Sequence, residues 1–161
     1  MIELVKVKPE QINILHNLLQ FYIYEFTSFN QQITLEEHGL FKPFDLEDYF
    51  TVPEKHPFFI KNEEEYVGFA LVESGTGEKP SNIDEFLIMR KHKGKGYGKA
   101  AATSIFEMFP GRWTVFQIER NTPAQGFWRK VIHDYTGGNY TEKTDEYKRV
   151  KQEFTIHSIM V

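Results

Sequence analysis

The stretch Arg90-Lys91-His92-Lys93-Gly94-Lys95-Gly96-Tyr97-Gly98-Lys99 holds five of the 19 basic residues of the chain and three glycines at alternate positions. It lies between an apolar run, Ile83 to Met89, that is typical of a β-strand and a helix predicted from about Tyr97 to Phe109. Glycine permits a positive φ and a close approach of the backbone, so successive N–H groups can converge on one anion. The free N–H groups and the positive dipole end of the following helix strengthen such a site. The stretch therefore predicts a turn that binds a pyrophosphate.

The spacing of the glycines argues against two common phosphate-binding motifs. A P-loop needs GxxxxGK[ST], whereas Gly94 and Gly98 are one residue too close together and Ala100 stands where Ser or Thr is required. A Rossmann fingerprint needs GxGxxG, whereas the third glycine here comes one position early. The acidic residue expected about 20 positions onward is also missing, Glu119 being the nearest. Neither motif accounts for the turn.

Hydrophobic periodicity and turn residues predict strands and helices on both sides of the turn. We expect strands at about 2–8, 57–62, 65–73, 83–89, 113–118 and 153–160, another short strand near Tyr140, and helices at about 9–26, 46–50, 97–109 and 122–133. In the last helix Thr122 is expected as the N-cap and Pro123 as the first helical residue, with Gly137-Gly138 beyond its end. This order predicts a mixed α/β sheet.

Composition excludes several functional classes. The chain has 161 residues, a length that suits one domain spanning 1–161, and its net charge is −4. Without cysteine it has no disulfide, thiolate zinc site or cysteine nucleophile. The six histidines lie at least 18 residues apart, so we expect no metal site. The longest apolar run has six residues and no signal peptide is visible, so we expect a cytoplasmic protein without a membrane partner.

The charge is unevenly distributed along the chain. Outside Arg90 to Lys99 there are 14 basic and 23 acidic residues, a balance of −9, while the stretch itself carries five positive charges. The overall charge argues against a dedicated DNA-binding protein, so we expect no nucleic-acid partner. The local charge indicates one small polyanion bound at one turn.

A third motif matches the turn. Lys93-Gly94-Lys95-Gly96-Tyr97-Gly98 resembles the [Q/R]xxGx[G/A] signature of the GCN5-related N-acetyltransferase (GNAT) superfamily, with Lys at the first position. Phe86-Leu87-Ile88-Met89 is similar to the fourth strand of that superfamily, and Asn121 to Trp128 resembles its NxxAxxxY segment. The resemblance covers about residues 83–138, which would form the cofactor-binding segment. It implies an α/β (α+β) fold with a mixed, mostly antiparallel sheet flanked by helices and splayed between the fourth and fifth strands.

The resemblance also implies an N-acetyltransferase that moves acetyl directly from acetyl-CoA to an amine. The backbone N–H groups of Gly94, Lys95, Gly96, Tyr97, Gly98 and Lys99 would hold the pyrophosphate of acetyl-CoA, and Lys93 would belong to the same cofactor site. The main chain of Leu87, Ile88 and Met89 would pair with the pantetheine arm as an added strand. Asn121 would bond the arm, and Phe127 and Trp128 would pack along it. Helix capping by Asn121 and core packing by the two aromatics are the alternative interpretations.

The chemistry requires a base, because a lysine-like amine of pKa ~10.4 is neutral in only about one molecule in a thousand near pH 7.4. Glu85 and Asp84 lie on the strand that would carry the thioester, and adjacent strand residues face opposite ways, so at most one points into the acceptor site. We favour Glu85. An N–H near Ile88 would hold the oxyanion.

The general acid is left open. In the family a tyrosine gives a proton to the departing thiolate, but the corresponding residue here is Trp128, whose indole supplies no useful proton. Tyr97 or Tyr135 could replace the missing tyrosine as proton donor, or catalysis could be slow. Alternatively, the thiol, with a pKa of ~8.5, could leave without a proton donor.

We expect the acceptor pocket to be built by the first helix, 29–57 and the C-terminal strand, which offer the aromatics Tyr22, Tyr24, Phe41, Tyr49 and Phe50. These favour a small-molecule or peptide amine with apolar bulk as acceptor, bound by a monomer or homodimer. One alternative is a domain that binds acyl-CoA without catalysis. Another is a nucleic-acid-binding domain that uses the basic turn.

Overall fold

The strands and helices occur in the predicted order. The computed structural model describes residues 1–158. Its strands are β1 (Ile2–Lys6), β2 (Lys55–Asn62), β3 (Glu65–Glu73), β4 (Ser81–Ile88), β5 (Gly111–Gln117), β6 (Thr141–Thr144) and β7 (Val150–Ile156), and its α-helices are α1 (Ile12–Phe26), α2 (Asp48–Thr51), α3 (Tyr97–Met108) and α4 (Thr122–Thr136). Within these residues, no helix has the length and apolar character needed to cross a membrane.

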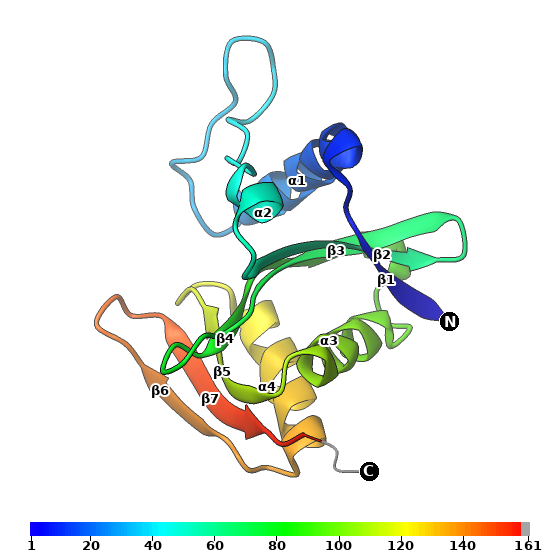
Figure 1. Ribbon diagram of the computed structural model, residues 1–161. Coiled ribbons are helices and arrows are strands. Elements are labelled where there is room, and N and C mark those ends of the chain that lie inside the picture. Colours follow the sequence, from blue (N-terminus) through cyan, green and yellow to red (C-terminus); the bar gives the residue numbers. More distant parts are fainter. Residues whose placement is uncertain (159–161) are drawn as a thin grey trace.

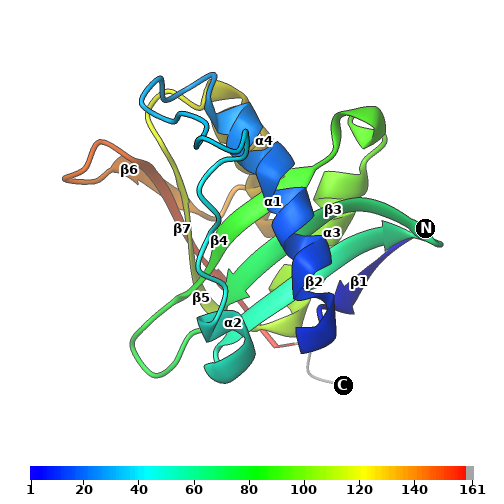
Figure 2. The same ribbon diagram turned by 90° about the horizontal axis from the view of Figure 1, so that it is seen from above.

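The strands form one seven-stranded sheet in the order β1-β2-β3-β4-β5-β7-β6. Neighbouring strands are antiparallel except for β4 and β5, which are parallel. Helices α1 and α2 cover one face of the sheet, and α3 and α4 cover the other (Figures 1 and 2). The predicted mixed, mostly antiparallel sheet flanked by helices is confirmed.

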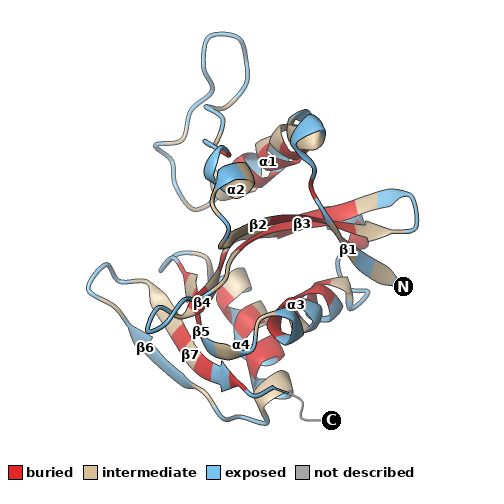
Figure 3. Cartoon of the chain, in the orientation of Figure 1, coloured by how far each residue is buried: buried red, intermediate tan, exposed pale blue. Residues whose placement is uncertain are grey.

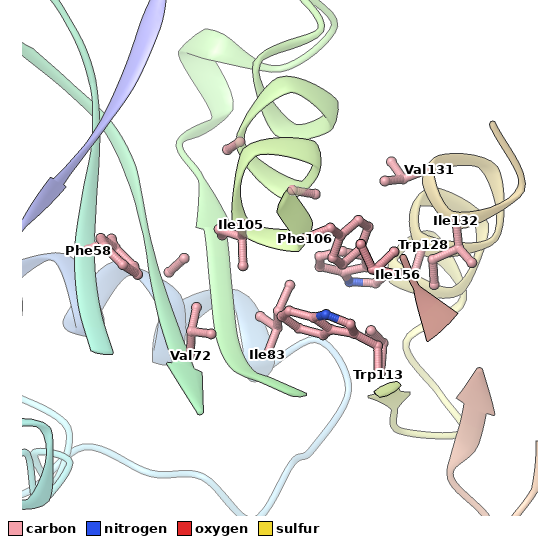
Figure 4. Packing of buried hydrophobic residues seen from close by; sticks show 14 of the residues in the cluster. Phe58, Val72, Ile83, Ile105, Phe106, Trp113, Trp128, Val131, Ile132 and Ile156 are labelled. Atoms are coloured by element: carbon pink, nitrogen blue, oxygen red, sulfur yellow. The ribbon is translucent and has the colours of Figure 1, made fainter. Parts of the chain in front are cut away.

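The inner strand β3 is buried on both faces, which explains its continuous apolar run. Phe69 and Leu71 pack in a cluster with α1, whereas Ala70 and Val72 belong to a second cluster with α3 and α4. Figure 4 shows part of this second cluster, where Phe106, Trp113 and Trp128 meet. Burial is therefore concentrated in the inner strands and the sheet-facing sides of the helices, whereas the long loop between α1 and α2 is largely exposed (Figure 3).

Strands β4 and β5 part almost at once. They pair only at Ser81 with Trp113 and at Asn82 with Thr114. The Met89 N–H donates to the Val67 carbonyl of β3 at 2.8 Å. Because N–H directions alternate along a strand, the N–H groups of Phe86 and Ile88 point away from β3, toward the opening. The predicted splay between the fourth and fifth strands is confirmed, and it leaves a free backbone edge.

Several predicted boundaries were wrong at the element ends. Pro9–Gln11 form a 3₁₀ turn, and the first α-helix begins at Ile12. The N-cap of α4 is Asn121 rather than Thr122, because the Asn121 side chain accepts a hydrogen bond from the Ala124 N–H at 3.1 Å. The last strand ends at Ile156 because its partner β5 begins at Gly111, directly opposite. The predicted continuation reaches Met160, which lies outside the described residues.

Gly68 offers a test of the packing between β3 and β4. A Cβ at this position would overlap the Leu87 carbonyl oxygen. We therefore expect Gly68→Ala to lower the free energy of unfolding by about 2–3 kcal/mol, measured by urea denaturation. Gly126→Ala is the matched control, because Gly126 lies in α4 with nothing within 4 Å of an added Cβ. It should stabilise the protein by about 0.5–1 kcal/mol. Equal effects of the two substitutions would contradict the described packing.

Candidate functional site

The glycine-rich turn has the backbone conformation that its sequence predicts. Gly94 and Gly96 have φ values of +79° and +80°, and Gly96 is the N-cap of α3. Added Cβ atoms at either position would meet nothing within 4 Å, so the backbone angle, not crowding, requires glycine there. Gly98 differs, because its Cβ would lie 2.8 Å from the Phe127 ring. Glycine is therefore required at 94 and 96 by the backbone path of the turn, and at 98 by the close approach of α3 to α4.

Three of the five basic side chains of the turn are already paired with carboxylates. Arg90 contacts Glu25 through two hydrogen bonds of 2.7 and 3.0 Å, Lys91 contacts Glu65 at 2.6 Å, and Lys99 contacts Asp134 at 2.9 Å. Lys93 and Lys95 have no ion pair within residues 1–158. The positive charge available to a ligand is thus smaller than the count of five suggests.

A cavity of about 590 Å³, here called the turn cavity, lies between β4, the turn, α3 and α4. Most of the predicted cofactor-binding residues line it: Leu87, Ile88, Lys93, Gly94, Gly96, Tyr97, Gly98, Lys99, Asn121, Phe127 and Trp128. Met89 and Lys95 are not among its lining residues. The cavity also contacts Tyr22 and Phe26 of α1, which the sequence did not assign to this site.

The aromatic wall of the turn cavity also belongs to the core. Phe127 stacks on Phe86 with ring centroids 5.8 Å apart, and Trp128 meets Phe86 edge-on at 5.1 Å. Trp128 is buried, so its position is fixed by packing. The Asn121 side-chain oxygen caps α4, which leaves its amide nitrogen and one lone pair of the oxygen for a ligand.

A second cavity of about 520 Å³, here called the loop cavity, lies between α1 and the segment 27–47. It is lined by Tyr22, Ile23, Phe26, Gln32, Ile33, Thr34, Glu36, Phe41, Lys42, Phe44 and Glu85. Two hydrogen bonds between Gln20 and the Phe41 backbone, of 2.9 and 3.0 Å, fix the loop against the helix. Only Tyr22 and Phe41 of the five predicted aromatics line this cavity, and no residue of β6 or β7 does so in the part of the chain described.

The predicted alternation of Asp84 and Glu85 was wrong. The register between β3 and β4 shifts at Leu71/Val72, because Leu71 pairs with Glu85 and Val72 with Ile83, so that Asp84 is an extra residue. Asp84 and Glu85 therefore lie on the same face, below α1 and α2. Asp84 accepts hydrogen bonds from Tyr49 Oη at 2.5 Å and from Lys55 Nζ at 3.1 Å, and it does not line the loop cavity.

Glu85 is the carboxylate that faces the loop cavity. Its side chain accepts a hydrogen bond from the Tyr22 hydroxyl. Burial raises the pKa of Glu85 to about 7, although the Tyr22 hydrogen bond acts in the opposite direction. Burial and the nearby Glu85 charge raise the pKa of Tyr22 well above its ordinary value. Near neutral pH the Glu85 carboxyl can therefore both take up and release a proton.

The structure distinguishes between the two tyrosines considered as substitutes for the missing proton donor. Tyr97 lines the turn cavity, and its hydroxyl accepts a hydrogen bond from the Asn62 side chain at 3.3 Å. Tyr135 packs against Phe106 and lines neither of the two cavities. Tyr22 lines both cavities, a property that no sequence signal could reveal, because its partner Glu85 is 63 residues away.

Known proteins share this architecture. The model of the acetyltransferase (GNAT) family matches residues 18–133, which include the C-terminal part of α1, the two candidate carboxylates and the glycine-rich turn. No curated protein sequence matches the chain.

Three solved structures are similar over nearly their whole length. An acetyltransferase from Thermus thermophilus has a TM-score of 0.71, 17% identity and 97% coverage of both chains. A chimeric spermidine N-acetyltransferase from Vibrio cholerae and hSSAT has a TM-score of 0.64 and 13% identity, covering 96% of this chain and 95% of that one. A putative streptothricin acetyltransferase from Bacillus anthracis str. Ames, solved in complex with acetyl coenzyme A, has a TM-score of 0.59 and 10% identity, covering 98% and 99%. At these identities the likeness shows the fold alone.

The raised pKa of Glu85 makes a prediction about stability. Between about pH 4.5 and 7 the unfolded chain releases the Glu85 proton while the folded chain retains it, so the free energy of unfolding falls as pH rises. Glu85→Gln removes this contribution. The free energy of unfolding of Glu85→Gln minus that of wild type should therefore rise by on the order of 3 kcal/mol between about pH 4 and about pH 8, measured by urea denaturation. The exposed Glu64→Gln should show no such gain, and a pH-independent effect of Glu85→Gln would contradict the buried carboxyl.

Proposed function

Since this chain belongs to the acetyltransferase (GNAT) family, we propose that it transfers acetyl from acetyl-CoA to the amine of a small molecule or peptide. The observation that carries this proposal is the pair of cavities on either side of Tyr22. One cavity opens on the glycine-rich turn and the free edge of β4, and the other contains a carboxyl whose pKa is about 7. Donor and acceptor would bind in separate cavities and react where the two meet.

The turn cavity suits acetyl-CoA on three grounds. The positive-φ glycines leave space for phosphate oxygens against the backbone N–H groups of 94–99, whereas the Lys93 N–H is bonded to the Arg90 carbonyl. The free edge of β4 can pair with the amides of the pantetheine arm. Because the Met89 N–H is bonded to Val67 and the Phe86 N–H faces the Tyr22 hydroxyl, the N–H of Ile88 is the donor left for this pairing. Phe127 and Trp128 provide an apolar wall. The Bacillus anthracis relative with bound acetyl coenzyme A supports the same assignment.

Glu85 is the proposed general base. An incoming ammonium would lose its proton to the Glu85 carboxylate, and the neutral amine would then attack the thioester carbonyl directly. The N–H groups on the free edge of β4 would hold the oxyanion that forms. Asp84, the alternative base, is engaged by Lys55 and Tyr49 outside the loop cavity.

The loop cavity favours a small cationic amine with an apolar body. Its walls combine Tyr22, Phe26, Phe41 and Phe44 with the carboxylates Glu36 and Glu85, against a single cation, Lys42. Aromatic faces and carboxylates both attract an ammonium group. The similarity in fold to a spermidine N-acetyltransferase is consistent with an amine acceptor.

A second candidate function is binding of acyl-CoA without catalysis. The observation in its favour is Trp128, a buried indole at the position where the family motif has a tyrosine. In this function acyl-CoA would bind in the same turn cavity, but Glu85 would have no catalytic role.

Binding of acetyl-CoA is testable through stability. At 100 times its Kd, acetyl-CoA should add roughly 2.7 kcal/mol to the free energy of unfolding of wild type, measured by denaturation with and without the ligand. Gly96→Asp places a carboxylate at the turn and should abolish this gain. Gly77→Asp is the matched control, because Gly77 also has a positive φ and open surroundings but lies in the loop at the other end of β4. Equal gains for wild type and Gly96→Asp would contradict the assigned site.

Catalysis is tested with an amine panel of phenethylamine, spermidine and a lysine-containing peptide. We expect thiol release with at least one of them, with kcat/KM rising as pH increases through about 7 because Glu85 must be ionised. Glu85→Gln should lower kcat/KM by about 100-fold or more, whereas Asp84→Asn should have a small effect. Binding of acetyl-CoA without turnover of any amine would instead support the non-catalytic alternative.

A further inference from the structure

The two cavities meet at very few side chains. Among their lining residues only Tyr22 and Phe26, both on α1, are common to the two. Glu85 lines the loop cavity alone, whereas the free edge of β4 that would carry the thioester lies along the turn cavity. A proton taken from the amine by Glu85 is therefore on the opposite side of Tyr22 from the departing sulfur.

Tyr22 is held rigidly at this junction. Its ring is buried and packs edge-on against Phe26 at 4.7 Å, Phe69 at 5.4 Å and Phe44 at 6.4 Å. Its hydroxyl donates a hydrogen bond to the Glu85 carboxylate, and the Phe86 backbone N–H faces the same hydroxyl oxygen. The hydroxyl is thus fixed between the proposed base and the opening of β4.

We propose that Tyr22 relays a proton from Glu85 to the departing thiolate, and so supplies the proton donor that is absent at Trp128. This role rests on the proposed acetyl transfer. Glu85 first passes the proton of the ammonium to solvent and is a carboxylate again. As the C–N bond forms and the C–S bond breaks, the amine nitrogen then gives its second proton to Glu85 Oε. The Tyr22 hydroxyl gives its proton to the sulfur and is reprotonated by Glu85. A neutral amine and a thioester thereby become an amide and a thiol, with both side chains restored.

The direction of transfer agrees with the acidities of the groups. A carboxyl of pKa about 7 is a stronger acid than a thiol of pKa ~8.5, so moving a proton from Glu85 to the thiolate is favourable. The pKa of Tyr22 is raised well above its ordinary value, so a free tyrosinate is disfavoured. The two proton movements at Tyr22 therefore occur together, and Tyr22 acts as a bridge rather than as an independent acid.

The test compares Tyr22→Phe with Tyr49→Phe, because each removes one hydroxyl that donates to a carboxylate of β4. Single-turnover acetyl transfer is measured with the panel amine that wild type uses fastest. Tyr22→Phe should lower the single-turnover rate constant by about 10–100-fold and leave the KM of both substrates within about threefold of wild type. Tyr49→Phe should leave the rate within about threefold. Acetyl-CoA-dependent stabilisation should persist in both variants, which shows that each folds and binds the donor.

A merely structural role for Tyr22 is excluded by two further readouts. The rate of wild type in mixtures of light and heavy water should show three protons in flight, from the amine to Glu85, from Glu85 to Tyr22 and from Tyr22 to sulfur. That of Tyr22→Phe should show only the first. The double variant Tyr22→Phe/Glu85→Gln should be no slower than Glu85→Gln alone, because both residues serve one relay. Full activity of Tyr22→Phe, an unchanged proton count or additive losses would overturn the relay while leaving acetyl transfer intact. Failure of wild type to acetylate any amine would instead refute the proposed function, and the relay with it.

Discussion

The early parting of β4 and β5 is the constraint on which the site depends. Within residues 1–158 the strands pair at two positions only, and beyond Asn82 the edge of β4 that faces β5 has no strand partner there. A free edge inside a sheet leaves unpaired backbone groups, which need a ligand or water. Strand β5 instead pairs along its whole length with β7, so the sheet remains continuous while it opens on one side of β4. The turn cavity occupies this opening.

The glycine-rich turn and the opening are parts of one arrangement. The turn follows β4 directly, so its N–H groups lie at the end of the same free edge. Gly98 lets Phe127 approach α3 closely, and Phe127 in turn stacks on Phe86. Strand, turn and both helices therefore set the width of one cavity together.

The other face of β4 supplies the titrating groups. The extra residue Asp84 interrupts the alternation, so two adjacent carboxyls lie below α1 and α2. Lys55 pairs with Asp84, whereas Glu85 accepts a hydrogen bond from the neutral Tyr22 hydroxyl. The carboxyl that faces the loop cavity, Glu85, is the one whose pKa burial raises to about 7.

The sequence by itself determined the order of the elements, the splayed sheet implied by the family resemblance, and the turn. Left-handed backbone angles at Gly94 and Gly96 depend on those residues alone, and apolar periodicity is likewise a local property. Only the tertiary structure decided which side of β4 Asp84 and Glu85 occupy, that most of the basic side chains in the turn are paired, and that Tyr22 joins the two cavities. The reason is that a register shift between strands, an ion pair and a contact across 63 residues all arise from packing between distant segments, which no local pattern records.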